Sequence, residues 1–242
     1  MWTNTLLYLI SRKINLGIKL ILWLSFCSSA TVLVCGKTTL FSIVQFTQRN
    51  NYNFLFFPFF LSITLSLTTL DFGLKWVLTG HSERRHKVAS ETSELVAQKT
   101  KAALTAGLNV IACIGEKLEE REANSTMAVC QSQLQPLLDM IPSDSEEWNR
   151  VVIAYEPVWA IGTGLTASPE QAEEVHNGLR NWLSSQGGEA GAEMASKVRI
   201  IYGGSVKPAN AELLIAMPNI DGFLVGGCSL KTDILDICRS CQ

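Results

Sequence analysis

Glu156 stands where a predicted buried strand ends and a loop begins. The apolar run Val151-Val152-Ile153 just before it favours a strand of a parallel sheet, and parallel strands carry their carboxyl ends to one edge. A carboxylate at that edge can accept a proton from a bound substrate. The plainer alternative is a strand-end glutamate that caps the next helix beside a buried tryptophan.

The loop after Glu156 has an unusual composition. It begins with Pro157, continues with the apolar residues 158–161, and ends with Gly162 and Gly164. An apolar flap that is hinged by proline and glycine beside a carboxylate can close over a small substrate and exclude water. The composition therefore predicts a lid next to a proton-accepting group.

Other chemically informative groups also follow predicted strands. His81 follows a strand at 76–79, Ser205 follows one at 198–202, and a Gly226-Gly227 turn follows one at 222–225. Glycine turns that expose N–H groups beside a hydroxyl suit a phosphate dianion. Glu156 as a base and a neutral His81 that polarises a carbonyl would together enolise a small phosphorylated aldose or ketose, although His81 alone could be a core histidine.

Strands and helices alternate from residue 76 onward. Further strands are expected at 109–114 and 151–153, and helices are expected over 91–106, 117–140, 209–217 and 230–238. Another helix is predicted to begin at Ser168, where Pro169 and Gln171 complete a capping box, and a small-residue loop is expected around 187–191. These five strand-helix units predict a parallel α/β sheet.

Length and charge limit the class of protein. The 242 residues suffice for one large α/β domain, and a net charge of −2 argues against a nucleic-acid partner. The acidic residues are unevenly distributed, because residues 1–70 contain none and residues 71–242 contain all 22. We therefore divide the chain into an atypical hydrophobic segment, 1–70, and a regular α/β region, 71–242.

The hydrophobic segment has three interpretations. Its uncharged runs at 20–36 and 50–70 could contact or span a membrane, or the segment could be a degenerate targeting presequence. It could also be non-coding sequence that a faulty gene model has translated. Residues 31–35 and 62–67 could supply further strands.

Several histidines, arginines and cysteines favour structural roles. His86 and His176 are expected to be solvated, Arg84 and Arg85 to stabilise the fold, and Cys113 to be packed at a strand end. The odd total of seven cysteines, without framework spacing, favours a reducing compartment. Cys238 and Cys241 have no second pair or histidine beside them, so no zinc site is predicted.

Five motifs in the α/β region carry a family resemblance. They occur in chain order as Gly80 to Arg85, Cys113 to Glu116, Ala154 to Gly164, Tyr202 to Val206, and Asp221 to Gly227. In each of them the sequence resembles triosephosphate isomerase, and the resemblance runs from about Asp71 to the end of the chain. It implies a TIM (β/α)8 barrel.

The resemblance also implies a reaction and its residues. Glu156 would move a proton between the two carbons of dihydroxyacetone phosphate and glyceraldehyde 3-phosphate. His81 would donate to the enediolate oxygens, and Glu83 would support the site beside His81. The family is itself the standard example of a glutamate base with a neutral histidine. Residues 157–165 would form the lid, and the phosphate would be held by Gly162, Ser205, Gly226 and Gly227. No metal or cofactor is implied, and the expected setting is glycolysis and gluconeogenesis in the cytoplasm, or a plastid or membrane if the segment 1–70 is genuine.

The sequence departs from the family before Asp71. The family's Asn-x-Lys motif is not found, because Lys13, Lys19 and Lys37 follow Ser, Gly and Cys at the second position before them. The loop that docks into the partner subunit of family homodimers is not found either. The barrel is therefore expected to be incomplete, and the alternatives are a non-catalytic or membrane-tethered phosphate-binding relative and another phosphate-binding barrel enzyme.

Overall fold

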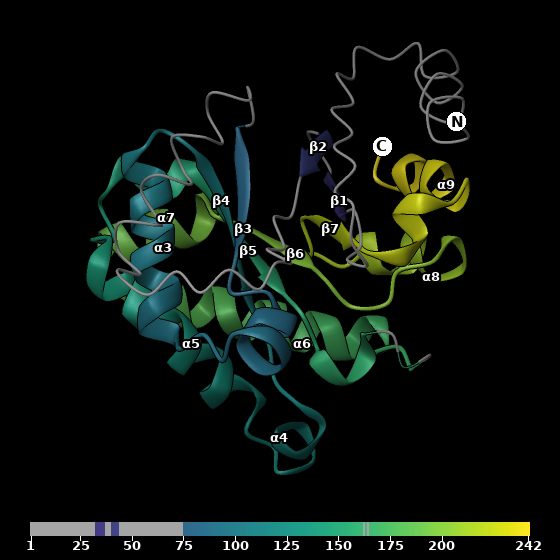
Figure 1. Ribbon diagram of the computed structural model, residues 1–242, viewed down its shortest axis with the longest axis horizontal. Helices are drawn as coiled ribbons and strands as arrows, with labels where there is room; N and C mark the ends of the chain where they lie inside the picture. The colour runs from purple at the N-terminus through teal and green to yellow at the C-terminus, as the bar shows by residue number, and fades with distance from the viewer. Residues whose placement is uncertain (1–31, 37–39, 44–74, 162, 164) are drawn as a thin grey trace, which may run out of the picture.

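The computed structural model describes residues 32–36, 40–43, 75–161, 163 and 165–242, and within them five parallel strands lie side by side in chain order (Figure 1). They are β3 (Trp76–Thr79), β4 (Asn109–Ile114), β5 (Val151–Tyr155), β6 (Arg199–Tyr202) and β7 (Gly222–Val225). The predicted parallel sheet is confirmed, and β3, β4 and β7 have the predicted bounds. The sheet and its helices form a curled half-barrel, consistent with an incomplete TIM barrel.

Helices connect the strands and cover the outer face of the sheet. They are α3 (Ser93–Thr105), α4 (Leu118–Glu122), α5 (Thr126–Met140), α6 (Pro169–Ser184), α7 (Glu189–Lys197), α8 (Pro208–Ile215) and α9 (Asp233–Ser240). Short π- or 3₁₀-helical turns occur as η1 (Arg84–Val88), η2 (Glu146–Arg150), η3 (Val158–Ala160) and η4 (Gly227–Leu230). The capping box at the start of α6 is confirmed, because Ser168 and Gln171 exchange side-chain and backbone hydrogen bonds.

The stretch 117–140 is mostly helical, as predicted, and it is divided into two helices because Asn124 adopts a left-handed conformation with φ 54° between α4 and α5. The loop expected around 187–191 gives way at Glu189 to helix α7. Its alanine, glutamate, methionine and lysine residues are strong helix formers, and they outweigh the glycines that favoured a loop.

A short hairpin extends the sheet beyond β7. Strand β1 (Val32–Gly36) pairs antiparallel with β7, and β2 (Leu40–Ile43) pairs antiparallel with β1. The prediction that residues 31–35 could supply a strand is therefore confirmed, but this strand does not have the parallel direction of a TIM barrel. Cα atoms of β2 come within 8 Å of β3, so the two ends of the curled sheet approach each other. The possible strand at 62–67 lies outside the described residues.

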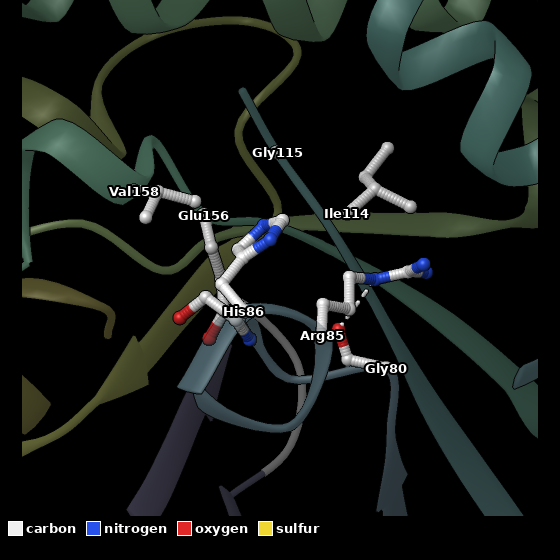
Figure 2. Close-up of a pocket in the computed structure, with 8 residues that line it drawn as sticks. Gly80, Arg85, His86, Ile114, Gly115, Glu156 and Val158 are labelled. Carbon is white, nitrogen blue, oxygen red and sulfur yellow. Dashed lines mark hydrogen bonds between the residues drawn. The ribbon is translucent and has the colours of Figure 1, made fainter. Parts of the chain in front are cut away.

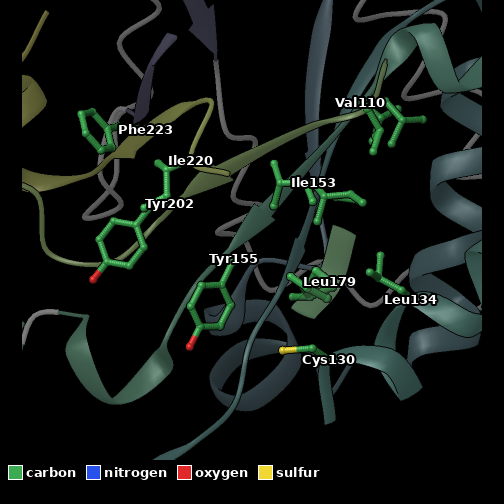
Figure 3. Packing of buried hydrophobic residues seen from close by; sticks show 14 of the residues in the cluster. Val110, Cys130, Leu134, Ile153, Tyr155, Leu179, Tyr202, Ile220 and Phe223 are labelled. Atoms are coloured by element: carbon green, nitrogen blue, oxygen red, sulfur yellow. The ribbon is translucent and has the colours of Figure 1, made fainter. Parts of the chain in front are cut away.

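Side chains of the parallel strands alternate between two faces of the sheet. On β5, for example, Ile153 and Tyr155 belong to the large cluster that packs against the helices (Figure 3). Val152 and Ala154 belong to a smaller cluster on the inner face. The inner cluster consists of Ile111, Cys113, Val152, Ala154, Ile201 and Leu224, with Trp76 and Leu78 against it. Continuing this alternation places Glu156, which follows Tyr155, on the inner side at the mouth of the sheet.

The predicted membrane contacts fall largely outside the described part of the chain. Of the run 20–36, the structure describes residues 32–36, which form β1, and the run 50–70 is not described. Among the residues that are described, no helix combines the length and apolar character needed to cross a bilayer.

Candidate active site

Glu156 and His81 meet at the carboxyl ends of β5 and β3. His81 Nε2 lies 3.2 Å from Glu156 Oε1, and the backbone N–H of Ser82 donates to Glu156 Oε2 at 3.1 Å. The Glu156 N–H donates to the carbonyl of Ile114 at 2.7 Å, which fixes the residue beside the end of β4. Both carboxylate oxygens of Glu156 are therefore held by donors from the loop that follows β3.

A glycine makes this close approach possible. A Cβ atom at Gly115 would lie 1.7 Å from the carbonyl oxygen of Glu156, a distance that no side chain can tolerate. The backbones at the ends of β4 and β5 therefore touch at this position. This explains why the Cys113 to Glu116 motif needs a glycine at its third position.

Glu156 is almost completely removed from solvent, with an exposed fraction of 2%. Burial raises the pKa of Glu156 because the ionised form loses hydration, and the nearby Glu83 also favours the neutral form. The His81 ring, the Ser82 N–H and Arg85 act in the opposite direction and stabilise the carboxylate. A carboxylate whose pKa is raised is a stronger base, which suits proton abstraction.

The hydrogen bonds of His81 determine its tautomer. Its Nδ1 accepts the backbone N–H of Glu83 at 3.4 Å, so a neutral ring carries its proton on Nε2. That Nε2–H is the group that faces Glu156. Glu83 therefore contacts His81 through its backbone N–H.

The beginning of the predicted lid is anchored to Glu116. The indole N–H of Trp159 donates to Glu116 Oε1 at 2.9 Å, and the hydroxyl of Tyr155 donates to the same oxygen at 3.1 Å. The N–H of Val158 also donates to the carbonyl of Glu116 at 3.0 Å. Burial raises the pKa of Glu116. Glu116 had no predicted role, and its only signal in the sequence was its place at the end of the Cys113 to Glu116 motif.

The predicted phosphate-binding residues follow the next two strands. Ser205 comes after β6, and Gly226 and Gly227 come directly after β7, where a Cβ atom at either glycine would meet no other atom within 4 Å. Their backbone is therefore accessible at the same edge of the sheet as Glu156. Gly162, the fourth predicted phosphate ligand, lies outside the described residues.

A small hollow borders Glu156 at the ends of β3, β4 and β5 (Figure 2), and its empty space of about 140 Å³ includes open solvent. It is lined by Gly80, Ser82, Arg85, His86, Ile114, Gly115, Glu156 and Val158. His81 meets Glu156 without lining this pocket, and Ser205, Gly226 and Gly227 also lie outside its wall. The structure thus brings Glu156 and His81 together and places the glycine turns beside the neighbouring strands.

The prediction for His176 is wrong. His176 is fully buried in α6, where it packs against the rings of Tyr155 and Tyr202 at centroid distances of 5.8 and 6.4 Å. Its Nδ1 lies 3.2 Å from the Asn219 carbonyl, and burial lowers its pKa to about 3. The sequence held a signal, because His176 follows Ala172 by four residues on the inner side of the helix.

The remaining predictions of structural roles concern His86, Cys113, Arg84 and Arg85. His86 is exposed and Cys113 is fully buried, as predicted. Arg84 forms an ion pair with Glu91 at 2.5 Å, and Lys99 also contacts that carboxylate. Arg85 instead donates to backbone carbonyls at the pocket. In the described part of the chain, no group of three or more His, Cys, Asp or Glu side chains is arranged to hold a metal ion.

The comparisons with known proteins agree with the geometry. A family model described as "Triosephosphate isomerase" matches residues 64–241. The chain is 54% identical over 167 residues to "Triosephosphate isomerase" of Taenia solium, which covers 69% of this chain and 65% of that protein. It is 57% identical over 161 residues to "Triosephosphate isomerase, chloroplastic" of Arabidopsis thaliana, covering 66% and 49%.

A third relative gives the same result. The chain is 54% identical over 172 residues to "Triosephosphate isomerase, cytosolic" of Gracilaria gracilis, which covers 70% of this chain and 66% of that protein. The chain thus spans about half to two thirds of the length of these relatives. A family model that matches most of the chain, together with relatives above 50% identity, establishes that the chain belongs to the triosephosphate isomerase family.

Proposed function

We propose that this chain interconverts dihydroxyacetone phosphate and glyceraldehyde 3-phosphate through an enediolate, as an aldose-ketose isomerase of glycolysis and gluconeogenesis. The observation that carries the proposal is the contact of 3.2 Å between the buried Glu156 carboxylate and His81 Nε2. The family assignment and the names of the relatives support the same reaction. The reaction moves protons only, so it needs no cofactor or metal.

Glu156 is the proposed base. Its two oxygens are held by His81 and by the Ser82 N–H, so one of these bonds must be released before the carboxylate reaches a substrate C–H. The proton leaves one carbon of the triose as an enediolate forms, and the same carboxyl group returns it to the neighbouring carbon. The hydroxyl proton of the triose passes from one enediolate oxygen to the other, so that the carbonyl moves to the carbon that lost its proton. The raised pKa of Glu156 favours this uptake because it stabilises the protonated carboxyl group.

His81 is the proposed electrophile. A neutral imidazole whose Nε2–H is free to leave Glu156 can donate to the carbonyl oxygen of the triose as negative charge develops there. The Glu83 N–H keeps the ring in the required tautomer, because it occupies Nδ1. Donation from His81 therefore stabilises the enediolate while Glu156 carries the proton.

The substrate phosphate is proposed to lie across the turns after β6 and β7. Ser205, Gly226 and Gly227 offer a hydroxyl and accessible backbone N–H groups there, and the lid residue Gly162 would add its own N–H. The bond of Trp159 to Glu116 would hold the first part of the lid over the site. Water exclusion by the lid would protect the enediolate.

The rate of this chain is expected to be lower than that of its relatives. The lysine of the Asn-x-Lys motif is not found, and the loss of one positioned electrostatic donor costs about 10²- to 10³-fold in rate. We further infer a homodimer, as is usual in the family, and a cytoplasmic location, with a plastid as the alternative. The relatives are named as cytosolic and chloroplastic forms.

Isomerisation of dihydroxyacetone phosphate by the purified full chain tests the proposal. The matched control is Glu156→Gln, purified in the same way, because it keeps the shape of the side chain but cannot take up the proton. It also measures any isomerase carried over from the expression host. Turnover in the wild-type chain that is lost in the variant supports the proposal, whereas phosphate binding with equal background rates in both would overturn it in favour of a non-catalytic relative.

A further inference from the structure

Arg85 occupies the wall of the pocket beside Glu156 and is 9% exposed. Its Nε donates to the carbonyl of Gly80 at 2.8 Å (Figure 2), and its Nη2 donates to the carbonyl of Cys113 at 3.2 Å. Its Nη1 donates to Ser93 Oγ at 3.2 Å. One guanidinium group therefore joins the ends of β3 and β4 and the start of α3.

The two carbonyls that Arg85 binds stand next to the groups that hold Glu156. Gly80 directly precedes His81 and Ser82, which supply the two donors to the Glu156 carboxylate. Cys113 directly precedes Ile114, whose carbonyl accepts the Glu156 N–H at 2.7 Å. The planar fork of Arg85 thus sets the distance between the His81 loop and the strand against which Glu156 is fixed.

The position before His81 is shaped around this guanidinium. Gly80 has a φ of +69°, and a Cβ atom there would lie 2.8 Å from Arg85 Nη2 and 2.9 Å from the Cys113 carbonyl oxygen. A larger residue would displace Arg85 from its seat even before the backbone strain is considered. The Gly80 to Arg85 motif therefore supplies both the glycine that leaves room for the guanidinium and the arginine that occupies this space.

Arg85 also contributes charge. The ionisable groups that act on or face Glu156 are His81 and Glu83 from the loop after β3, Arg85 from η1, and Cys113 from β4. Among these, Arg85 is a permanent cation, and it favours the ionised form of Glu156 against the cost of burial. Its neighbour Arg84 points its charge at Glu91 instead.

We propose that Arg85 is a positioning residue of the Glu156 site, which holds His81 and Glu156 in register through the Gly80 and Cys113 carbonyls and supplies the buried positive charge beside the base. It acts through these groups and does not touch the substrate. The proposal rests on the proposed isomerase function, and it concerns how that site is assembled rather than which reaction it performs.

The test compares Arg85→Lys, Arg85→Gln and the matched control Arg84→Gln. Lysine keeps the charge but cannot hold both carbonyls, so we expect kcat to fall about 10-fold through misplacement, with the acid limb of the pH profile little changed. Glutamine loses the charge too, so we expect a fall of about 10²-fold and an acid limb shifted to higher pH. Arg84→Gln is expected to lower stability and leave the acid limb in place.

A titration separates this proposal from the isomerase proposal. The carboxyl signal of Glu156 and the amide signal of Ser82 can be followed by NMR with or without turnover. We expect the midpoint of Glu156 to rise in Arg85→Gln and to stay near the wild-type value in Arg84→Gln. The positioning role would be overturned, even if the wild-type chain is active, by equal titration midpoints of Glu156 in the wild-type chain, Arg85→Gln and Arg84→Gln. Arg85 variants that lose only thermal stability would also overturn it.

A second variant covers the case in which Arg85→Gln fails to fold. Gly80→Ala keeps Arg85 and crowds its guanidinium, so it should perturb the Ser82 amide signal and lower kcat in the same direction as Arg85→Lys. Wild-type kcat and an unshifted Ser82 signal in a folded Gly80→Ala protein would contradict the proposal.

Discussion

The inner and outer faces at the mouth of the sheet use similar residues for different purposes. On the inner face, Glu156 is held by His81 and the Ser82 N–H, two donors at the edge of an open pocket. On the outer face, Glu116 is held by Tyr155 and Trp159 and is fully buried. Burial raises the pKa of both carboxyl groups. What distinguishes the proposed base from the anchor is therefore its place beside the hollow at the strand ends, because the chemical type and the burial are alike.

The largest expected difference between the faces is in catalysis. Glu156→Gln removes the proposed base, so kcat is expected to fall about 10³-fold, within the range for loss of general base catalysis. Glu116→Gln keeps an oxygen that can accept from Tyr155 and Trp159, so we expect a fall of about 10-fold or less. Steady-state kinetics on the pair measures both, and equal losses would break the distinction between base and anchor.

The lid anchor can be tested separately through Trp159. Trp159→Phe keeps an aromatic ring but removes the N–H that donates to Glu116 Oε1, a bond to a charged group that is worth about 1.5–3 kcal/mol. If the bond forms only when the lid is closed, kcat/KM is expected to fall about 10- to 100-fold. A wild-type value in the variant would contradict a bond that stabilises only the closed lid.

The buried histidine of the outer face predicts a loss of stability in acid. The pKa of His176 is lowered from 6.5 to about 3 by burial, with Arg180 acting in the same direction, so below 6.5 the unfolded chain binds a proton that the folded chain does not. Stability therefore falls as the pH drops from 6.5 toward 3, by about 1.4 kcal/mol per pH unit.

Denaturant unfolding at about pH 6.5 and about pH 5 measures this loss. The contribution of His176 to the free energy of unfolding should fall by about 2 kcal/mol between the two pH values. His176→Phe should lessen the dependence on pH. His86→Gln should lessen it less, because His86 is exposed and its pKa is lowered by partial burial and by Lys117 and Arg85. The same acid slope in wild type and His176→Phe would contradict the assignment.

The smallest effect is expected away from both faces. Ser90, in the loop before α3, has a φ of 47°, in the left-handed region that glycine adopts without cost. Ser90→Gly is therefore expected to raise the free energy of unfolding by about 0.5–1 kcal/mol, since relief of strain outweighs the added freedom of the unfolded chain. Thermal unfolding measures the gain, and kcat should not change.

Much of the fold could be predicted because the signals were local. The apolar runs of β3, β4 and β7 fixed their bounds, and the chain order of strand-helix units fixed a parallel sheet. The position of Glu156 followed from strand alternation. His81 and Glu156 follow β3 and β5 of the same parallel sheet, so both were expected at the same edge of that sheet.

The remaining features depend on contacts that the sequence does not display. Glu116 is an anchor because Trp159 folds back onto it, and Arg85 differs from Arg84 because only Arg85 points at the ends of the strands. Helix α7 was obscured by Gly187 and Gly188 just before it and by Gly191 in its first turn. The direction of β1 depends on pairing with β7, a distant partner that no local pattern identifies.

That pairing has a consequence for how the molecule is made. Leu33 lies opposite Val225 across the ladder between β1 and β7, so nearly the whole polypeptide separates the two partners. During synthesis the hairpin emerges first, and it must wait for the last strand before its outer hydrogen-bonding groups are satisfied. Contacts so distant in sequence form slowly. Among the strands that the structure describes, β1 therefore keeps one edge open to pairing with another chain until β7 has been made.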